Sequence, residues 1–180
     1  MEDPREDVKT VIQQLVCRPT LQQQAEALRT YFTPDVQFYH FYINIAGGRR
    51  DLTAIYQMAE FLFNYQAVKF HDIVYDEFAN AVAVNMTVYI RPWLAFYTEH
   101  HNLVFFILLE LENHIREDGK KVKLIKVQRD FFERSPSFLL LPFIGRAYNS
   151  VWLRVLLGHA IVIFVRSLRF VASVFFPDHM

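Results

Sequence analysis

Polar side chains interrupt the strongly apolar segments of this chain at a few positions, and these are the residues best suited to chemistry. An imidazole exchanges protons near neutral pH, and a carboxylate can orient it or share the proton in acid–base catalysis. The positions are His40, His71, Asn85, Tyr89, His100, His101 and Asp130. The candidates for catalysis among them are His40, His71, Tyr89 and Asp130.

His40 stands in an aromatic run, and strand alternation places Phe38, His40 and Tyr42 on one face. One hypothesis makes His40 a general acid or base oriented by a carboxylate such as Asp130. The alternative is a structural histidine that is hydrogen-bonded to a tyrosine at the edge of the core. Under a binding function, Phe38, His40, Tyr42 and Asp130 are candidate ligand contacts.

The strands that follow offer a second group of candidates. His71 and Asp72 are adjacent, so on a strand they point to opposite faces and cannot form a catalytic pair with each other. Asn85, Thr87 and Tyr89 share one face of the next strand. This stripe is either the wet side of a sheet or a pocket wall that orients an apolar ligand. Asn85 and Tyr89 are therefore candidate ligand contacts.

A metal site is the third hypothesis, because His100 and His101 follow Glu99 and imidazoles suit transition metals. Neighbours on a strand diverge, however, and no closely spaced histidine motif occurs, so a solvated strand end is the better interpretation. Cys17 is the only cysteine, which excludes an intrachain disulfide and a cysteine-based zinc site. Phosphate-loop and nucleophile motifs are also missing from the sequence. We predict no metal and no cofactor, and the sequence does not establish an enzyme.

The composition is typical of one folded domain followed by a tail of opposite net charge. The chain has 180 residues, 53% of them hydrophobic, and its 19 basic and 19 acidic residues cancel. The zero is an average, because residues 1–135 carry a net charge of −3 and residues 136–180 a net charge of +3. Zero net charge argues against a general nucleic-acid binder. The N-terminus lacks the layout of a secretory signal, so we expect a reducing, cytoplasmic setting.

The elements that must position the candidate residues are helices followed by a meander of strands. Apolar periodicity predicts a helix around residues 8–16, and Thr20 with Gln23 forms a capping-box pattern that opens a second. Asp51 is expected to cap a third helix, through about residue 66. Leu103–Leu109 is apolar at every position, so both its faces should be covered, and Phe106 within it is a further candidate ligand contact. The predicted strands are 36–45, 69–78, 81–90, 96–112 and 122–132, with a turn at Arg116–Gly119.

With this order of elements the chain resembles the NTF2-like superfamily, which includes SnoaL-like cyclases, ketosteroid isomerases and scytalone dehydratase. The matching features are the paired N-terminal helices, the strand Val36–Ile45, the helix opening at Asp51, and the closing Gln128-Arg129-Asp130-Phe131-Phe132. Over about residues 5–134 it looks most like the fungal SigF-like NTF2-like domain proteins. The resemblance implies an α+β cone: a curved antiparallel sheet, N-terminal helices packed on it, and a pocket inside. It also implies a homodimer, since such sheets commonly pair.

Residues 136–180 form the second segment, a C-terminal helical extension. Ser135-Pro136 is typical of a helix start, and a second helix is expected from about residue 150 to 176. On it Arg154, His159, Arg166, Arg169 and Ser173 fall within about 140° of one another at about 100° per residue. This predicts a basic amphipathic helix that lies in a membrane interface. Packing on the sheet or on a second copy, a true membrane anchor, and a strand are the alternatives. The candidate membrane contacts are Trp152, Arg154, Phe164, Arg166, Arg169 and Phe175.

Two functions are therefore expected. The first is non-catalytic binding of a hydrophobic small molecule or lipid by residues 1–135, held peripherally on a membrane by residues 136–180. The second is a SnoaL-like or dehydratase-like enzyme that acts on an apolar polycyclic or polyketide-type substrate. In that enzyme His40 or His71 would work with Asp130, and Tyr89 would polarise a carbonyl.

Overall fold

The computed structural model describes residues 1–92, 101–116, 118–133 and 150–175. The side chains of Arg154 and of residues 169–175 also lie outside the description, so the predicted roles of Arg154, Arg169 and Phe175 are not addressed by it. The same holds for His100 and for the helix expected between residues 136 and 148. The chain divides into two compact units, Met1–Pro136 and Ser137–Met180, and each is described by itself.

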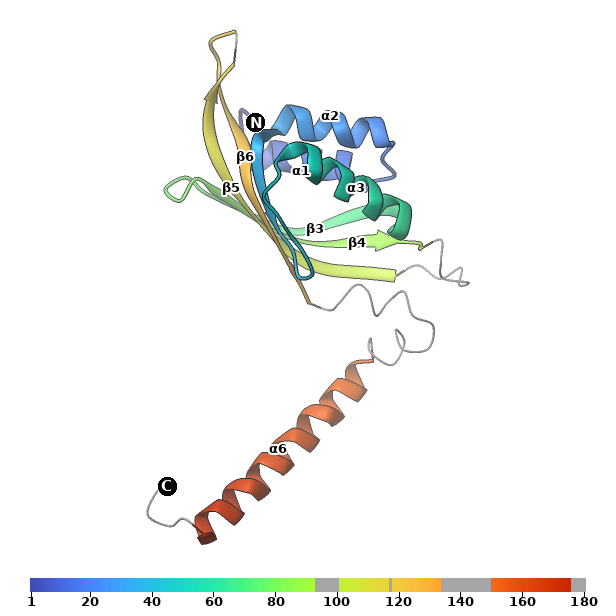
Figure 1. Ribbon diagram of the computed structural model, residues 1–180, viewed down its shortest axis with the longest axis vertical. Helices are drawn as coiled ribbons and strands as arrows, with labels where there is room; N and C mark the ends of the chain where they lie inside the picture. The colour runs from blue at the N-terminus through green and yellow to red at the C-terminus, as the bar shows by residue number, and fades with distance from the viewer. Residues whose placement is uncertain (93–100, 117, 134–149, 176–180) are drawn as a thin grey trace. The chain divides into compact units, whose positions relative to one another are not determined.

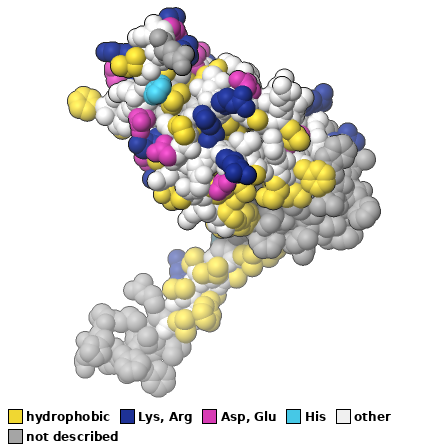
Figure 2. All heavy atoms as spheres, turned by 45° about the horizontal axis from the view of Figure 1, so that its top comes forward, with side chains coloured by type: hydrophobic (Ala, Val, Ile, Leu, Met, Phe, Trp, Pro, Cys, Tyr) yellow, Lys and Arg dark blue, Asp and Glu magenta, His cyan; other side chains and the backbone are white. Residues whose placement is uncertain are grey.

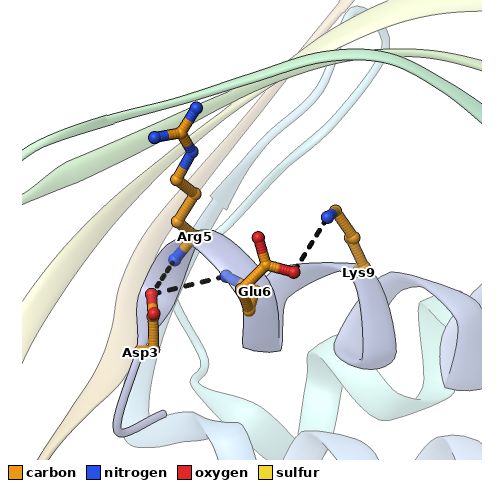
Figure 3. A network of polar contacts seen from close by, with 4 residues as sticks. All are labelled: Asp3, Arg5, Glu6 and Lys9. Atoms are coloured by element: carbon orange, nitrogen blue, oxygen red, sulfur yellow. Dashed lines mark hydrogen bonds and ion pairs between the residues drawn. The ribbon is translucent and has the colours of Figure 1, made fainter.

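The first unit begins with helix α1, Pro4–Val16, whose start is set by Asp3. The Asp3 carboxylate accepts hydrogen bonds from the backbone N–H groups of Arg5 and Glu6, at 3.0 and 3.4 Å (Figure 3). These bonds satisfy donors that a helix N-terminus leaves free. One turn on, Lys9 pairs with Glu6 on the exposed side, while Val8, Val11 and Leu15 face the core.

Helix α2, Leu21–Tyr31, confirms the predicted capping box of Thr20 and Gln23. Helix α3, Arg49–Phe63, begins two residues before the position expected from Asp51, so the predicted cap is wrong. Gly48 is the N-cap, with φ of 79°, and a Cβ there would lie 2.3 Å from the carbonyl oxygen of Pro34. Glycine tolerates this conformation and approach, so the helix starts immediately after it.

The six strands form one curved sheet in the order β2-β1-β6-β5-β4-β3, with α1, α2 and α3 on its concave side (Figure 1). All neighbouring pairs are antiparallel except β1 and β6, which run parallel. The expected curved antiparallel sheet with helices packed on it is confirmed, and the pair of β1 and β6 is its parallel exception. The strands are β1 Phe32–Tyr39, β2 Asn44–Ile45, β3 Tyr65–Asp76, β4 Ala81–Ile90, β5 His101–Ile115 and β6 Lys121–Phe132.

The single strand predicted over 36–45 is a hairpin instead, with β1 ending at Tyr39 and β2 beginning at Asn44. A backbone hydrogen bond from the N–H of His40 to the carbonyl of Ile43, 2.9 Å, closes the turn. The Nδ1 atom of His40 accepts a second bond from the N–H of Tyr42, 3.3 Å. The aromatic run therefore folds back on itself without the glycine or proline that usually marks a turn.

The face of the sheet that meets the helices, called the inner face below, carries the core. Alternating residues of β4 and β5 are buried on it, and the register pairs Val84 with Ile107 and Met86 with Phe105. The outer face carries the residues in between. Phe106 lies there with 51% of its surface exposed, so the expectation that both faces of Leu103–Leu109 are covered is wrong at Phe106.

The second unit contains helix α6, Val151–Phe175. Val151–Leu168 has a mean hydropathy of 1.7, which makes this helix long and apolar enough to cross a membrane by length and composition. The described side chains of α6 are mostly hydrophobic (Figure 2), and all but Leu153 are exposed. Its polar groups bond back to the helix, since His159 Nδ1 donates to the carbonyl of Val155 at 2.8 Å and Ser167 Oγ to that of Ile163 at 2.9 Å.

Candidate functional site

A row of polar side chains crosses the inner face at the end of β6. Gln128 and Asp130 are two residues apart on that strand, so both point towards the helices. Gln128 Nε2 donates to Asp130 Oδ1 at 2.8 Å and to the Tyr56 hydroxyl of α3, also at 2.8 Å. Gln128 is almost completely buried. The amide thus holds the Asp130 carboxyl in place and links it to the helix layer.

Burial changes the acid–base behaviour of this row. It raises the pKa of Asp130 to about 7, although the hydrogen bond from Gln128 pulls in the opposite direction. Burial, together with the charge of Asp130, raises the pKa of the Tyr56 and Tyr65 hydroxyls. Burial also raises the pKa of Glu60 to about 6, although its carboxylate accepts the N–H of Tyr65 at 3.2 Å. Near neutral pH Asp130 is therefore divided between its protonated and charged forms, whereas Glu60 is mainly charged.

Asp130 opens onto a hollow of about 270 Å³ at the junction of β6 and the β1–β2 turn. The Asp130 residue is partly exposed to this hollow, and its carboxyl group is surrounded by protein atoms. The hollow is lined by Tyr39, His40, Phe41, Arg129, Asp130, Phe131 and Phe132. Four of these seven residues are aromatic and apolar in their rings, so the hollow, called the pocket below, is suited to an apolar ligand.

His40 faces the same pocket from the end of β1. Its ring lies edge-on to Phe132 with centroids 4.8 Å apart, and next to Phe38 and Tyr42 at 5.7 and 5.5 Å. Burial lowers the pKa of His40, so the neutral imidazole is favoured near pH 7. Because Nδ1 accepts the N–H of Tyr42, the neutral ring carries its proton on Nε2.

The structure brings His40 and Asp130 to one pocket, but among the described residues no hydrogen bond joins them. Phe38 is buried beside the pocket on the inner face, where its ring lies 6.5 Å from that of Tyr56. Tyr42, in the turn, is 46% exposed and contacts His40. Four of the predicted ligand contacts therefore lie in or next to one site: Phe38, His40, Tyr42 and Asp130.

The remaining candidates of the sheet lie on its outer face. A β-bulge between Phe70 and Asp72 brings His71 and Asp72 to this same face, so the expectation that they point to opposite faces is wrong. His71 Nε2 lies 2.8 Å from Thr87 Oγ1, and the register pairs Asn85 with Phe106 and Tyr89 with Asn102. The sheet stands between these side chains and Asp130, so the combination of His71 or Tyr89 with Asp130 is not assembled. Asn85 Oδ1 is buried there with no hydrogen-bond partner among the described residues.

No metal site accompanies these residues: in the part of the chain that the structure describes, no group of three His, Cys, Asp or Glu side chains could hold an ion. His101 is the first residue of β5. In α6, Trp152 and Phe164 are 70% and 63% exposed, and Arg166 is exposed as well.

Sequence reasoning missed Tyr56, Tyr65 and Gln128. Tyr56 lies in the amphipathic helix α3, where a tyrosine gives no sign of a polar role, and its hydroxyl meets a partner 72 residues away. Gln128 could have been found, since alternation from Asp130 puts it on the same face. Together the residues of the site place a neutral carboxylic acid and a neutral imidazole N–H against an apolar, aromatic wall. Such a site can bind a hydrogen-bond acceptor and can exchange a proton with it.

Comparison with known proteins gives the family and the fold. Three solved structures are similar over most of their length, and their 13–16% identity bears on the fold alone. A putative hydroxylase, AclR, from Streptomyces galilaeus has a TM-score of 0.51 at 13% identity, covering 98% of this chain and 99% of its own. A putative SnoaL-like polyketide cyclase from Jannaschia sp. CCS1 has a TM-score of 0.51 at 14% identity, and the match covers 69% of this chain and 83% of the cyclase. An LEH-like epoxide hydrolase from M. tuberculosis has a TM-score of 0.50 at 16% identity, and the match covers 72% of this chain and 81% of the hydrolase.

None of the curated proteins compared with this chain matches it. The family model of the SigF NTF2-like domain matches residues 1–172, which includes the whole site and most of α6. The α+β architecture, with its curved sheet, its packed helices and its C-terminal helix, agrees with that match. The chain belongs to the SigF NTF2-like domain family.

Proposed function

We propose that the first unit binds a small, largely apolar molecule that carries a carbonyl or a similar hydrogen-bond acceptor. The observation that carries the proposal is the Asp130 carboxyl, which has a pKa of about 7 and opens onto a pocket with aromatic walls. A charged ligand would meet a desolvated site, whereas an apolar ligand gains from leaving water. The pocket is near the lower end of ligand-site volumes, which suits a small molecule or one end of a longer one.

Two donors are available to the acceptor of the ligand. Below pH 7 the Asp130 carboxyl holds a proton, and Gln128 occupies only its Oδ1 atom among the described residues. The Oδ2 atom can then donate to a carbonyl oxygen. The Nε2–H of His40 is the second donor, since Nδ1 already accepts the N–H of Tyr42. Above pH 7 the carboxylate repels an acceptor, so affinity falls as the pH rises.

A fluorescent ketone tests this half of the proposal. The probe is 6-propionyl-2-(dimethylamino)naphthalene, whose emission moves to the blue in an apolar site. We expect the full-length protein to bind it about tenfold more tightly at pH 6 than at pH 8.5, the value of about one hydrogen bond. Titration of fluorescence at both pH values gives the two dissociation constants.

Two variants at one position sharpen the test. Asp130→Asn keeps a donor without a titrating proton, so its affinity should be the same at both pH values. Asp130→Leu has no donor and should bind weakly at both. Asp72→Asn, on the outer face, is the matched control and should behave as the parent protein. Equal pH dependence in the parent and Asp130→Asn would refute the role of Asp130.

Attachment to a membrane through α6 is the second half of the proposal. It is supported by the predominantly apolar 18-residue segment Val151–Leu168, which contains two arginines and at 1.5 Å per residue extends about 27 Å, close to the thickness of a bilayer core. Most of the described side chains of this helix are apolar, with Arg166 the charged exception, and its His159 and Ser167 bond to its own backbone. Such bonding lowers the cost of placing polar groups in lipid.

Vesicle flotation tests the attachment with the domain left unchanged. Ile161→Glu with Phe164→Glu introduces two charges into α6 and should reduce the floated fraction about tenfold. The matched control is Leu21→Glu with Met58→Glu, two exposed apolar residues of the first unit, which should float as the parent does. If the parent does not float, the attachment is refuted. Resistance to an alkaline carbonate wash then separates a helix that crosses the bilayer from one that lies on it.

A proton-transfer enzyme is the second candidate function, favoured by the pKa of Asp130 being close to neutral. In its carboxylate form Asp130 would take a proton from the carbon next to the carbonyl of the substrate. The electron pair of the broken C–H bond moves to the oxygen as an enolate, which the Nε2–H of His40 stabilises. The protonated Asp130 exchanges its proton with the solvent and then returns one to the carbon, which completes the exchange.

Deuterium exchange tests this second function. The protein should speed the incorporation of deuterium next to the carbonyl of 2-tetralone in D₂O, followed by NMR. The acceleration should fall about a hundredfold in Asp130→Asn, the usual contribution of a general base. A parent protein that gives no acceleration over buffer would exclude this chemistry for a simple ketone and leave the binding function.

A further inference from the structure

The β1–β2 turn exposes an unusual amount of aromatic surface. Phe41 is 69% exposed and Ile43 37% exposed, and Tyr39 and Tyr42 are also classed as exposed. These four residues are called the aromatic tip below. No charged residue occurs from Val36 to Gly48. Exposed large apolar side chains gathered at one place mark contact surfaces more often than ordinary solvent-facing ones.

The aromatic tip is continuous with the pocket. Tyr39 and Phe41 line the pocket as well as the tip, together with His40 between them. On the other side of the pocket, Phe131 is 54% exposed. Any surface that covers the aromatic tip therefore lies next to the pocket opening.

The aromatic tip offers only a small contact area, which limits the kind of partner that can bind it. The four side chains of one tight turn offer much less surface than the roughly 800 Å² per partner that a stable protein interface buries. A bilayer needs no such complementary surface. Phe and Ile enter its acyl region, and tyrosine side chains are enriched at the level of the headgroups. The composition of the aromatic tip thus fits a lipid interface better than a protein partner.

The path of the chain supplies the second argument. Phe132, the last residue of β6, lines the pocket, so the polypeptide leaves the first unit at that site. Only residues 133–150 separate it from the start of α6. Fully extended, 18 residues reach about 60 Å. With α6 held in a membrane, a tether of this length would keep the first unit near the lipid, and a weak contact of the aromatic tip would then act at high effective concentration.

We propose that the aromatic tip of Tyr39, Phe41, Tyr42 and Ile43 inserts into the bilayer interface, so that the pocket opens towards lipid and receives its ligand from the membrane. This inference rests on the membrane attachment proposed above. It adds the surface of the domain that meets the membrane and the direction from which the ligand arrives.

Site-specific fluorescence tests the contact in the full-length protein. Cys17, the only cysteine, is replaced by Ser, and single cysteines at Ile43→Cys and Phe78→Cys carry an environment-sensitive NBD label. Phe78 is the matched control, since it is fully exposed in the turn between β3 and β4, which is well separated from the β1–β2 turn in Figure 1. The vesicles contain phosphatidylcholine, phosphatidylserine and a spin-labelled lipid that quenches NBD on contact.

We expect vesicles to shift the emission of the label at position 43 to the blue and to quench it about threefold more than the label at position 78. Equal quenching at both positions on vesicles that float the protein would overturn the inference and leave the attachment through α6 intact. Loss of flotation by the labelled parent would overturn both. A label at position 43 that shifts only when protein is concentrated without vesicles would assign the aromatic tip to a second copy instead.

Transfer of the naphthalene ketone gives an independent measurement. Ile43→Asp places a charge at the aromatic tip outside the pocket lining, and Phe78→Asp makes the same change at the control turn. The transfer of ketone from vesicles to Ile43→Asp should be about tenfold slower than to Phe78→Asp, while affinity in buffer is the same for both. Equal transfer rates would contradict delivery from the membrane.

Discussion

Charged side chains on the two faces of the sheet lie in different environments and behave differently. On the inner face Asp130 is held by Gln128, which is itself bonded to Tyr56, and burial moves the pKa of Asp130 to about 7. On the outer face Arg129, its neighbour in sequence, pairs with Glu110 at 3.0 Å and lies over the ring of Tyr39 in a partly exposed site. The same strand thus carries a proton-holding acid on one side and an ordinary surface ion pair on the other. Burial, more than residue type, separates the two.

The largest expected effect tests that contrast with two adjacent phenylalanines. Phe105 is buried and stacks on Phe132 with ring centroids 4.8 Å apart, whereas Phe106 is half exposed. Phe105→Ala should lower the free energy of unfolding by about 3–4 kcal/mol, and Phe106→Ala by less than about 1 kcal/mol. Urea denaturation of the two variants measures both. Similar losses would show that something covers the outer face in solution.

The next effect concerns the cost of burying Asp130. Its pKa is about 7 in the folded protein and near 3.8 when unfolded, so the folded state holds the proton between those values and loses stability as the pH rises through them. Asp130→Asn should therefore be more stable than the parent by roughly 2–4 kcal/mol at pH 8, with a difference that shrinks towards pH 4. Urea midpoints across this range measure it. Asp72→Asn should change stability by less than about 0.5 kcal/mol.

A smaller effect isolates the hydrogen bond from Gln128. That bond favours the carboxylate, so Gln128→Met should raise the pKa of Asp130 further, by about one unit. Carbon NMR of the carboxyl group follows the titration directly. Tyr56→Phe is the control, because it leaves the bond from Gln128 to Asp130 in place and should move the pKa less. A larger shift in Tyr56→Phe would mean that the tyrosine, and not the amide, controls the acid.

The smallest effect compares two histidines. His71→Ala removes one hydrogen bond to Thr87 on the outer face, so it should cost about 1 kcal/mol of stability or less and leave ketone affinity within twofold. His40→Phe keeps an aromatic ring in the pocket but removes its donor, and should weaken ketone binding about fivefold. Fluorescence titration measures both. A greater loss of affinity in His71→Ala would contradict the separation of the two faces.

Local signals explain how far the sequence could predict this fold. The capping box at Thr20, the strand Ala81–Ile90 and the end of β6 at Phe132 were confirmed, because each depends on residues close in sequence. The hairpin at His40 was missed, since its turn is closed by a backbone bond and a side-chain nitrogen, neither of which alters the pattern of residue types. The parallel pairing of β1 with β6 has no local signal at all.

The site was predictable in part for the same reason. His40 and Asp130 are conspicuous as polar residues in apolar surroundings, and they line one pocket. Tyr56 is not conspicuous, because a tyrosine on an apolar helix face looks like any other core residue. The faces of Asn85 and Asp130 could not be related from sequence either. They depend on the register across β5, which shifts between Glu110 and Leu111.

The parallel pairing of β1 with β6 also determines when the pocket can exist during folding. Phe38 pairs with Gln128, so the two walls come from segments separated by 90 residues. The meander of β3, β4 and β5 closes by contacts between consecutive strands, whereas this pair must close a loop of 90 residues. On a ribosome the pocket cannot form until β6 has emerged, and α6 begins after a further 18 residues. The proposed ligand binding and the proposed membrane attachment would therefore be acquired almost together.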